Sequence, residues 1–253
     1  MDTAQAALDA LDRRAWQARF VSRSGLRSAV DAMLRLAPPG SPAAAKAHFH
    51  LAVSHWQANL HAESELARRH AEELFARHDH AAGLANCRDL EAQVARIAGH
   101  HAYALDLYRI NRALPDAART AAEHCVTCAG EGAVYMVTGE HDACQRVWSI
   151  AVSLAQRADN PGLEVSALSN LAAWNIGVCN FEDGRQLSQR AVDLADQTFD
   201  LSHPEDMMGS WFSSGMNLLV ALDSLGRHTE ARSVAARLLA LQTHFSPSQR
   251  ANY

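Results

Sequence analysis

A period of forty residues is the feature that most constrains the fold of this chain. Leucines, turn-forming residues and small residues each recur at this spacing over five or six units, although the last interval is 47 residues. Columns that stay in register in this way indicate an internal repeat rather than one irregular globular core. The columns are Leu34, Leu74, Leu114, Leu154 and Leu194; Asn59, Gly99, Gly139, Cys179 and Gly226; Ser64, Ala104, Cys144, Gly184 and Ala231; and Ala52, Ala92, Gly132, Ala172 and Leu219.

The composition indicates that the repeated unit is helical. The chain of 253 residues has 49 Ala and 28 Leu, against 14 Val and 4 Ile. Alanine and leucine favour helices, whereas a sheet of this size needs β-branched and aromatic residues. We therefore expect an all-α fold, and a β-sandwich or β-barrel is excluded.

Each unit is expected to contain a helix, a tight turn at the Gly/Asn column and a second helix. Helical periodicity is found over residues 81–98, 101–114, 117–138 and 141–157. The small residues on both sides of the turn would let the two helices approach closely. Proline suits the first position of a helix, so helix starts are predicted at four X-Pro pairs. These pairs are Ser41-Pro42, Asn160-Pro161, His203-Pro204 and Ser246-Pro247.

Charge and cysteine content exclude several classes of protein. The net charge is −5, so no strong positive field favours nucleic acid or an anionic membrane as a partner. No apolar run approaches the roughly 18–20 residues that span a bilayer, and the acidic N-terminus is not that of a signal peptide. Five cysteines, an odd number, favour a reducing compartment. We expect a cytoplasmic protein.

The repeated residues resemble those of the tetratricopeptide repeat (TPR) family. The family pattern of a small residue, a tyrosine three residues later, a glycine turn and Ala-x3-aromatic is met in part by Gly132, Tyr135, Gly139, Cys144 and Trp148. Neighbouring units carry other parts of the pattern, and the period is 40 residues instead of 34. The resemblance covers about residues 41–243 and implies a right-handed α-solenoid.

The repeat register also divides the chain. We expect one domain over residues 1–253, in which residues 1–40 form an N-terminal helical pair and residues 41–243 form about five repeats. Residues 244–253 would begin a further helix. Because a solenoid needs a polar terminal cap, we expect either a fragment of a longer polypeptide or an open end that pairs with a second copy.

Histidine and cysteine provide the only candidates for metal or redox chemistry. Four of the 14 histidines, His61, His101, His141 and His228, lie two residues after the turn column and so occupy one repeated structural position. Cys125 and Cys128 form a Cys-x-x-Cys pair after His124, but a structural zinc site needs four ligands and no second cysteine pair exists. No hydrolase or nucleotide-binding motif is present. We expect no enzymatic activity, no metal and no cofactor.

The resemblance implies that the first helix of each pair lines the concave face of the array, where partners bind. A groove there would be aromatic at one end, polar in the second unit and apolar in the middle, which suits an extended peptide or a partner helix. The alternative is that its aromatic residues are core. The candidate groove residues are Lys46, Phe49, Trp56, Gln57, Asn86, Asp89, Gln93, Arg96, Met136, Ser169 and Met216, and the same register adds Ile97, Val137 and Val220.

Long-period arrays of this kind resemble the TPR regions of bacterial regulators, including diguanylate cyclases. This resemblance implies a non-catalytic protein-interaction and sensory module that controls an effector domain outside this sequence. Two alternatives remain open. One is a small-molecule or metal receptor around Cys125, Cys128, Cys144 and Trp148, and the other is a purely structural dimerisation module that forms a homodimer.

Overall fold

The computed structural model describes residues 3–200 and 209–242, which form twelve α-helices and one short 3-10 helix. Consecutive helices pack against each other, so the predicted all-α repeat array is confirmed. The helices are α1 (Thr3–Ala18), α2 (Arg23–Leu36), α3 (Pro42–Gln57), α4 (His61–Arg77), α5 (Ala81–Ile97), α6 (His101–Arg112), η1 (Asp116–Ala118), α7 (Ala121–Thr138), α8 (His141–Arg157), α9 (Pro161–Gly177), α10 (Phe181–Thr198), α11 (Ser210–Ser224) and α12 (His228–Gln242).

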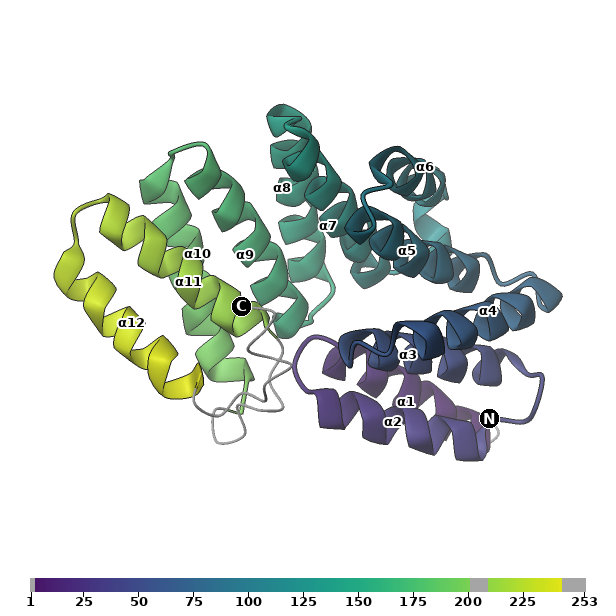
Figure 1. Ribbon diagram of the computed structural model, residues 1–253. Coiled ribbons are helices and arrows are strands. Elements are labelled where there is room, and N and C mark those ends of the chain that lie inside the picture. Colours follow the sequence, from purple (N-terminus) through teal and green to yellow (C-terminus); the bar gives the residue numbers. More distant parts are fainter. Residues whose placement is uncertain (1–2, 201–208, 243–253) are drawn as a thin grey trace.

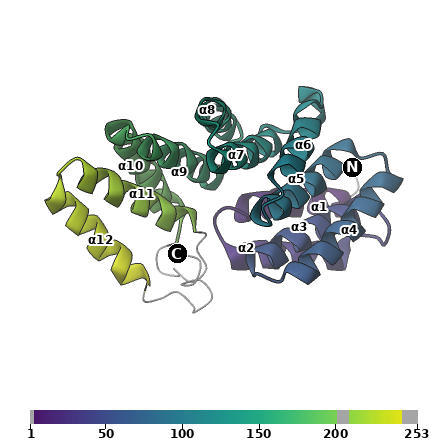
Figure 2. The same ribbon diagram turned by 45° about the horizontal axis from the view of Figure 1, so that its top comes forward.

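The helix pairs follow one another along an arc, from α3–α4 to α11–α12 (Figure 1). The first pair, α1–α2, packs against α3 at one end of this arc, as the turned view also shows (Figure 2). Each first helix contacts its own partner and also the first helix of a neighbouring unit, as α5 does with both α3 and α7. This pattern of contacts places the odd-numbered helices in one continuous layer. No helix in the described part of the chain is long and apolar enough to span a membrane.

The turn column has the backbone conformation that its sequence predicts. All five residues have positive φ: 59° at Asn59, 83° at Gly99, 80° at Gly139, 62° at Cys179 and 73° at Gly226. A left-handed residue at the end of a helix lets the chain reverse and start the next helix. The forty-residue period is thus a period of left-handed turns.

Cys179 occupies a conformation that costs a non-glycine residue roughly 1–2 kcal/mol. We expect Cys179→Gly to raise the free energy of unfolding by up to about 1 kcal/mol, because glycine relieves this strain but loses more entropy on folding. Asn59→Gly is the matched control and should change little, because asparagine tolerates the left-handed region. Thermal denaturation of both variants tests the difference, and a less stable Cys179→Gly protein would contradict it.

The small residues beside the turns are buried, as predicted. Cys144 and Ala104 are fully buried, and a Cβ atom added to Gly184 would lie 2.7 Å from Cγ1 of Ile176. A side chain at Gly132 would collide with the indole of Trp148. The two helices of each pair therefore touch where the sequence has its smallest residues.

The connection between α6 and α7 departs from the repeat. Three other connections between successive pairs pass through Gly40, Asp79 and Asp159, which all have positive φ. Here α6 ends at Arg112, two residues before the predicted end, and α7 begins at Ala121, four residues after the predicted start. A 3-10 turn fills the gap. The predicted helix starts at 203–204 and 246–247, and the further helix at 244–253, lie outside the described residues.

Candidate functional site

A hollow of about 310 Å³ lies among the first helices of four successive units. It contains five of the candidate groove residues, which α3 and α5 contribute. The structure therefore brings together side chains that are separated by up to a full repeat in the sequence. The lining residues are Arg19, Phe20, Val53, Trp56, Gln57, Asp89, Leu90, Gln93, Arg96, Tyr108, Val126, Ala129, Gly130, Ala133, Leu163, Ser166 and Asn170.

The turn between α1 and α2 enters the space between α3 and α9. Gln57 Nε2 donates a hydrogen bond to the Arg19 carbonyl oxygen at 2.9 Å, and Asn160 Nδ2 donates to the Trp16 carbonyl at 3.5 Å. Phe20 packs against the core formed by α7, α8 and α9. A Cβ atom at Gly162 would lie only 3.0 Å from the Cβ of Phe20, so a small residue is required there. The N-terminal pair thus links two distant units.

Arg19 brings a buried cation to this hollow. The residue is only 8% exposed, and its guanidinium carbon lies 5.1 Å from the ring centre of Trp16 and 5.8 Å from that of Phe49. Burial lowers the pKa of Arg19 to about 10, although the carboxylates of Asp89 and Glu123 act in the opposite direction. Among the described residues, no oxygen accepts a hydrogen bond from this guanidinium.

A second arginine of the hollow also keeps a free donor. Arg96, on α5, is half-buried, and its Nε atom is buried without a hydrogen-bond partner in the described part of the chain. Gln57 Oε1 is likewise buried and unpaired there. Buried polar atoms in folded proteins are normally satisfied. The hollow therefore presents more hydrogen-bonding capacity than its own residues use.

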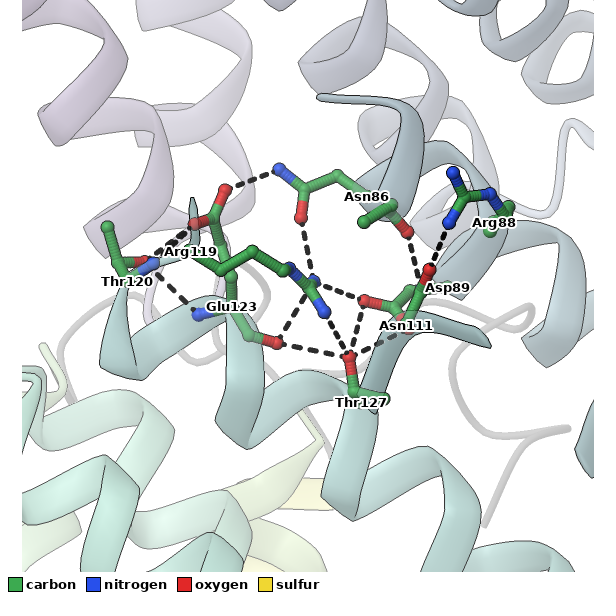
Figure 3. A network of polar contacts seen from close by, with 9 residues as sticks. Asn86, Arg88, Asp89, Asn111, Arg119, Thr120, Glu123 and Thr127 are labelled. Atoms are coloured by element: carbon green, nitrogen blue, oxygen red, sulfur yellow. Dashed lines mark hydrogen bonds and ion pairs between the residues drawn. The ribbon is translucent and has the colours of Figure 1, made fainter. Parts of the chain in front are cut away.

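Beneath the hollow, Asp89 is the centre of a buried polar network (Figure 3). Its carboxylate forms an ion pair with Arg119 at 2.7 Å, accepts a hydrogen bond from Asn111 Nδ2 at 2.8 Å and accepts another from Thr127. Both charged side chains of this ion pair are almost completely buried. The network joins α5, α6 and α7 to the loop that precedes α7.

Asn86 and Glu123 extend this network toward the start of α7. Asn86 Nδ2 donates to Glu123 Oε1 at 2.6 Å, and Asn86 Oδ1 accepts from Arg119 (Figure 3). Glu123 Oε2 accepts from the backbone N–H of Thr120, which forms a capping box with it. The capping box fixes where α7 begins. The loop before α7 then holds Arg119 so that its side chain points into the array and pairs with Asp89.

A second hollow, of about 590 Å³, lies between α1, α3 and the start of α7. Three candidate groove residues, Lys46, Phe49 and Asn86, line it. Asp12 on α1 accepts hydrogen bonds from Lys46 Nζ at 2.7 Å and His50 Nε2 at 2.8 Å. Burial acts to raise the pKa of Asp12, but these hydrogen bonds and charges outweigh it and lower the pKa to about 2. The lysine predicted for partner binding is thus engaged within the protein.

The other candidate groove residues are divided between the core and the surface. Phe49 and Ser169 are buried, and the carbonyl oxygen of Ser169 accepts a hydrogen bond from Asn217 Nδ2 at 2.9 Å. Met136 is half-buried against a core cluster. Met216, on α11, is exposed, and the same is true of the three apolar residues that the repeat register added to the candidate groove. These three residues are Ile97, Val137 and Val220.

The three cysteines of the receptor alternative lie in two separate cores. Cys125 and Cys128 pack with residues of α8 and α9, whereas Cys144 and Trp148 belong to a core formed by α5 to α9. Burial raises the pKa of Cys125 to about 12, so this thiol stays protonated at neutral pH. Within residues 3–200 and 209–242, no group of three or more His, Cys, Asp or Glu side chains could hold a metal ion.

The four histidines that follow the turn column occupy equivalent positions in the structure, as the repeat register predicts. His61, His101, His141 and His228 are the first residues of α4, α6, α8 and α12. Each lies directly after an intra-pair turn and belongs to a different unit. They are therefore equivalent helix-start residues, as the sequence predicts.

The array resembles solved structures of low sequence identity. Over 96% of this chain and 92% of the other, it superposes on the crystal structure of BtubC (BKLC) from P. vanneervenii with a TM-score of 0.61 and 12% identity. A putative kinesin light chain from Podosopora anserina with nearly identical TPR-like repeats gives a TM-score of 0.42 at 12% identity, covering 96% of this chain and 97% of that one. No protein-family model and no curated protein matches this sequence.

The class of protein follows from the helix pairs, the left-handed turns and the structural similarity to BtubC. The chain is a TPR-like repeat array, a fold that generally serves as a protein-interaction module and is typically non-catalytic. At 12% identity the similarity establishes the fold alone.

Proposed function

We propose that this array is a non-catalytic interaction module that holds a partner peptide against its odd-numbered helices. The main support is the exposure of apolar side chains at groove positions of three units. Ile97 and Val137 are 61% and 60% exposed, are separated by one repeat and lie at the C-terminal ends of α5 and α7. Met216 and Val220 are exposed on α11. Exposed apolar side chains on several first helices of the array suit an extended or helical peptide.

A regulatory role is the finer part of this proposal. It is supported by the sequence resemblance to TPR regions of bacterial regulators such as diguanylate cyclases. In an array, a small change of angle between units adds up along the chain. A bound peptide that favours one curvature would shift the population of curvatures and so reposition an effector domain. The cysteine usage supports action in the cytoplasm.

The double substitution Ile97→Asp and Val137→Asp tests the interaction surface. Peptides selected from a display library on the wild-type protein are expected to bind the double variant at least about tenfold more weakly, because each buried apolar anchor contributes about 1.5–3 kcal/mol. Leu66→Asp is the matched control, because Leu66 lies on α4 and is 72% exposed. It should leave peptide affinity unchanged.

Two outcomes would contradict this proposal. Either no peptide is selected, or the selected peptides bind the double variant as tightly as the wild type. Light scattering on the same proteins separates the homodimer alternative. A mass that rises with concentration without any peptide, and that falls to the monomer in the double variant, would assign this surface to self-association.

A further inference from the structure

We propose that the hollow between Arg19 and Arg96 binds a small organic monocarboxylate with an apolar or aromatic body. The site is separate from the exposed apolar residues proposed to hold a peptide, so it stands or falls independently of that function. It lies between α3, α5, α7 and α9 and is closed on one side by the turn after α1.

The unused hydrogen-bond donors of the two arginines require a partner. Arg19 is 8% exposed as a whole residue and its guanidinium donates no hydrogen bond to the described residues, and the buried Nε of Arg96 has no hydrogen-bond partner in the same set. Leaving such groups unsatisfied is costly, especially when they carry charge. The planar fork of a guanidinium matches a carboxylate with two parallel hydrogen bonds. An acidic ligand therefore supplies what both side chains lack.

The charges around the hollow favour a single negative charge on the ligand. Arg19, Arg96 and Arg119 contribute three positive charges, and Asp89 and Glu123 contribute two negative charges. Asp89 is already neutralised by Arg119, at 2.7 Å. One carboxylate would balance the remaining charge, whereas a phosphate dianion would leave a buried excess of negative charge.

The walls of the hollow determine the rest of the ligand. Phe20 and Trp56 are accompanied by the aliphatic side chains of Val53, Leu90 and Val126. The volume of about 310 Å³ lies at the lower end of the range for small-molecule sites, roughly 300–1,000 Å³. A ring or short alkyl chain attached to one carboxylate has the size and polarity that this space accepts.

Calorimetric titration with phenylacetate tests the proposal, with phenylacetamide as the uncharged analogue of the same shape. We expect phenylacetate to bind and phenylacetamide not to bind at the same concentrations. Tryptophan fluorescence gives a second readout, because Trp56 lines the hollow. Its change on titration should disappear in Trp56→Phe. Separate titrations with inorganic phosphate and with a short peptide that has a free C-terminal carboxylate test whether another kind of anion is the ligand.

Substitutions assign the binding to the two arginines. Arg19→Gln and Arg96→Gln are each expected to weaken phenylacetate binding at least about tenfold, the loss of one charged hydrogen bond. Arg146→Gln, on the exposed surface of α8, is the matched control and should change nothing. If Arg19→Gln does not fold, Arg96→Gln decides, because Arg96 is only half-buried.

Four results would overturn the proposal. The first is that none of phenylacetate, benzoate and acetate binds at millimolar concentration, and the second is that phenylacetamide binds as tightly as phenylacetate. The third is that phosphate or the peptide binds while phenylacetate does not. The fourth is that Arg96→Gln leaves the affinity for phenylacetate unchanged. None of these results bears on the double substitution at Ile97 and Val137, so the two proposals fail separately.

Discussion

Replacing Arg119 with methionine is expected to lower the free energy of unfolding by about 3–5 kcal/mol, the range for breaking a buried ion pair. The substitution removes the ion-pair partner of Asp89 and leaves a buried carboxylate that, among the described residues, accepts hydrogen bonds only from Asn111 and Thr127. It also releases the loop before α7 from Asn86 and from the carbonyl oxygen of Glu123. Urea denaturation followed by circular dichroism measures the loss.

Arg69→Met is the matched control for this experiment. Arg69 pairs with Glu65 on the surface of α4 and is 70% exposed. Such pairs contribute about 0–1 kcal/mol. The double variant Asp89→Asn with Arg119→Met should lose less stability than the sum of the two single variants, because it leaves no unpaired buried charge. A loss below about 1 kcal/mol for Arg119→Met would show that the network does not hold the loop.

The second large effect is expected at Asp12, which links α1 to α3. Because the pKa of Asp12 in the folded protein is lowered from 3.8 to about 2, its ionised form stabilises the fold. A depression of this size corresponds to about 2 kcal/mol. We expect Asp12→Asn to lose that amount at neutral pH. Lys46 and His50 then keep their positions without a negatively charged partner.

The pH dependence gives the sign of this effect. The contribution of Asp12 is complete above its unfolded pKa of about 4 and is lost as the pH falls toward about 2, because the folded protein then takes up the proton. The stability difference between wild type and Asp12→Asn should therefore shrink over this interval. Asp106→Asn, at an exposed pair with Arg109, is the control. A difference that stays constant down to pH 2 would contradict the assignment.

Residues within one repeat were enough to predict the class of fold and, to within two residues, the boundaries of the helices expected over residues 81–157, apart from the start of α7. The turn residues Gly99 and Gly139 and the small residues Ala104 and Cys144 have local causes. A left-handed turn favours glycine or asparagine, and closely packed helices need small side chains, whatever the rest of the chain does. Such requirements recur in every unit and therefore appear as periodic columns.

The candidate groove was predicted less completely. Register alone identified Trp56, Gln57, Gln93 and Arg96, which the structure brings to one hollow. Register could not distinguish these residues from Phe49, which is buried, because the exposure of a residue on an inner helix face depends on what packs over that residue. The turn after α1 packs over Phe49. Arg19 lies in a segment that aligns with the repeats at only one leucine, so no periodic signal marked it.

What the sequence determined by itself is therefore the repeat, and what only the tertiary structure decided is how the repeats are bridged. Arg119 stands one repeat from Asp79 and Asp159, where those residues form left-handed turns, yet it enters the core and pairs with Asp89. Arg19 reaches the same region from the N-terminal pair. Both placements depend on contacts between units, and the curvature of the array determines these contacts. A pattern that repeats every forty residues describes a single unit, so it cannot predict them.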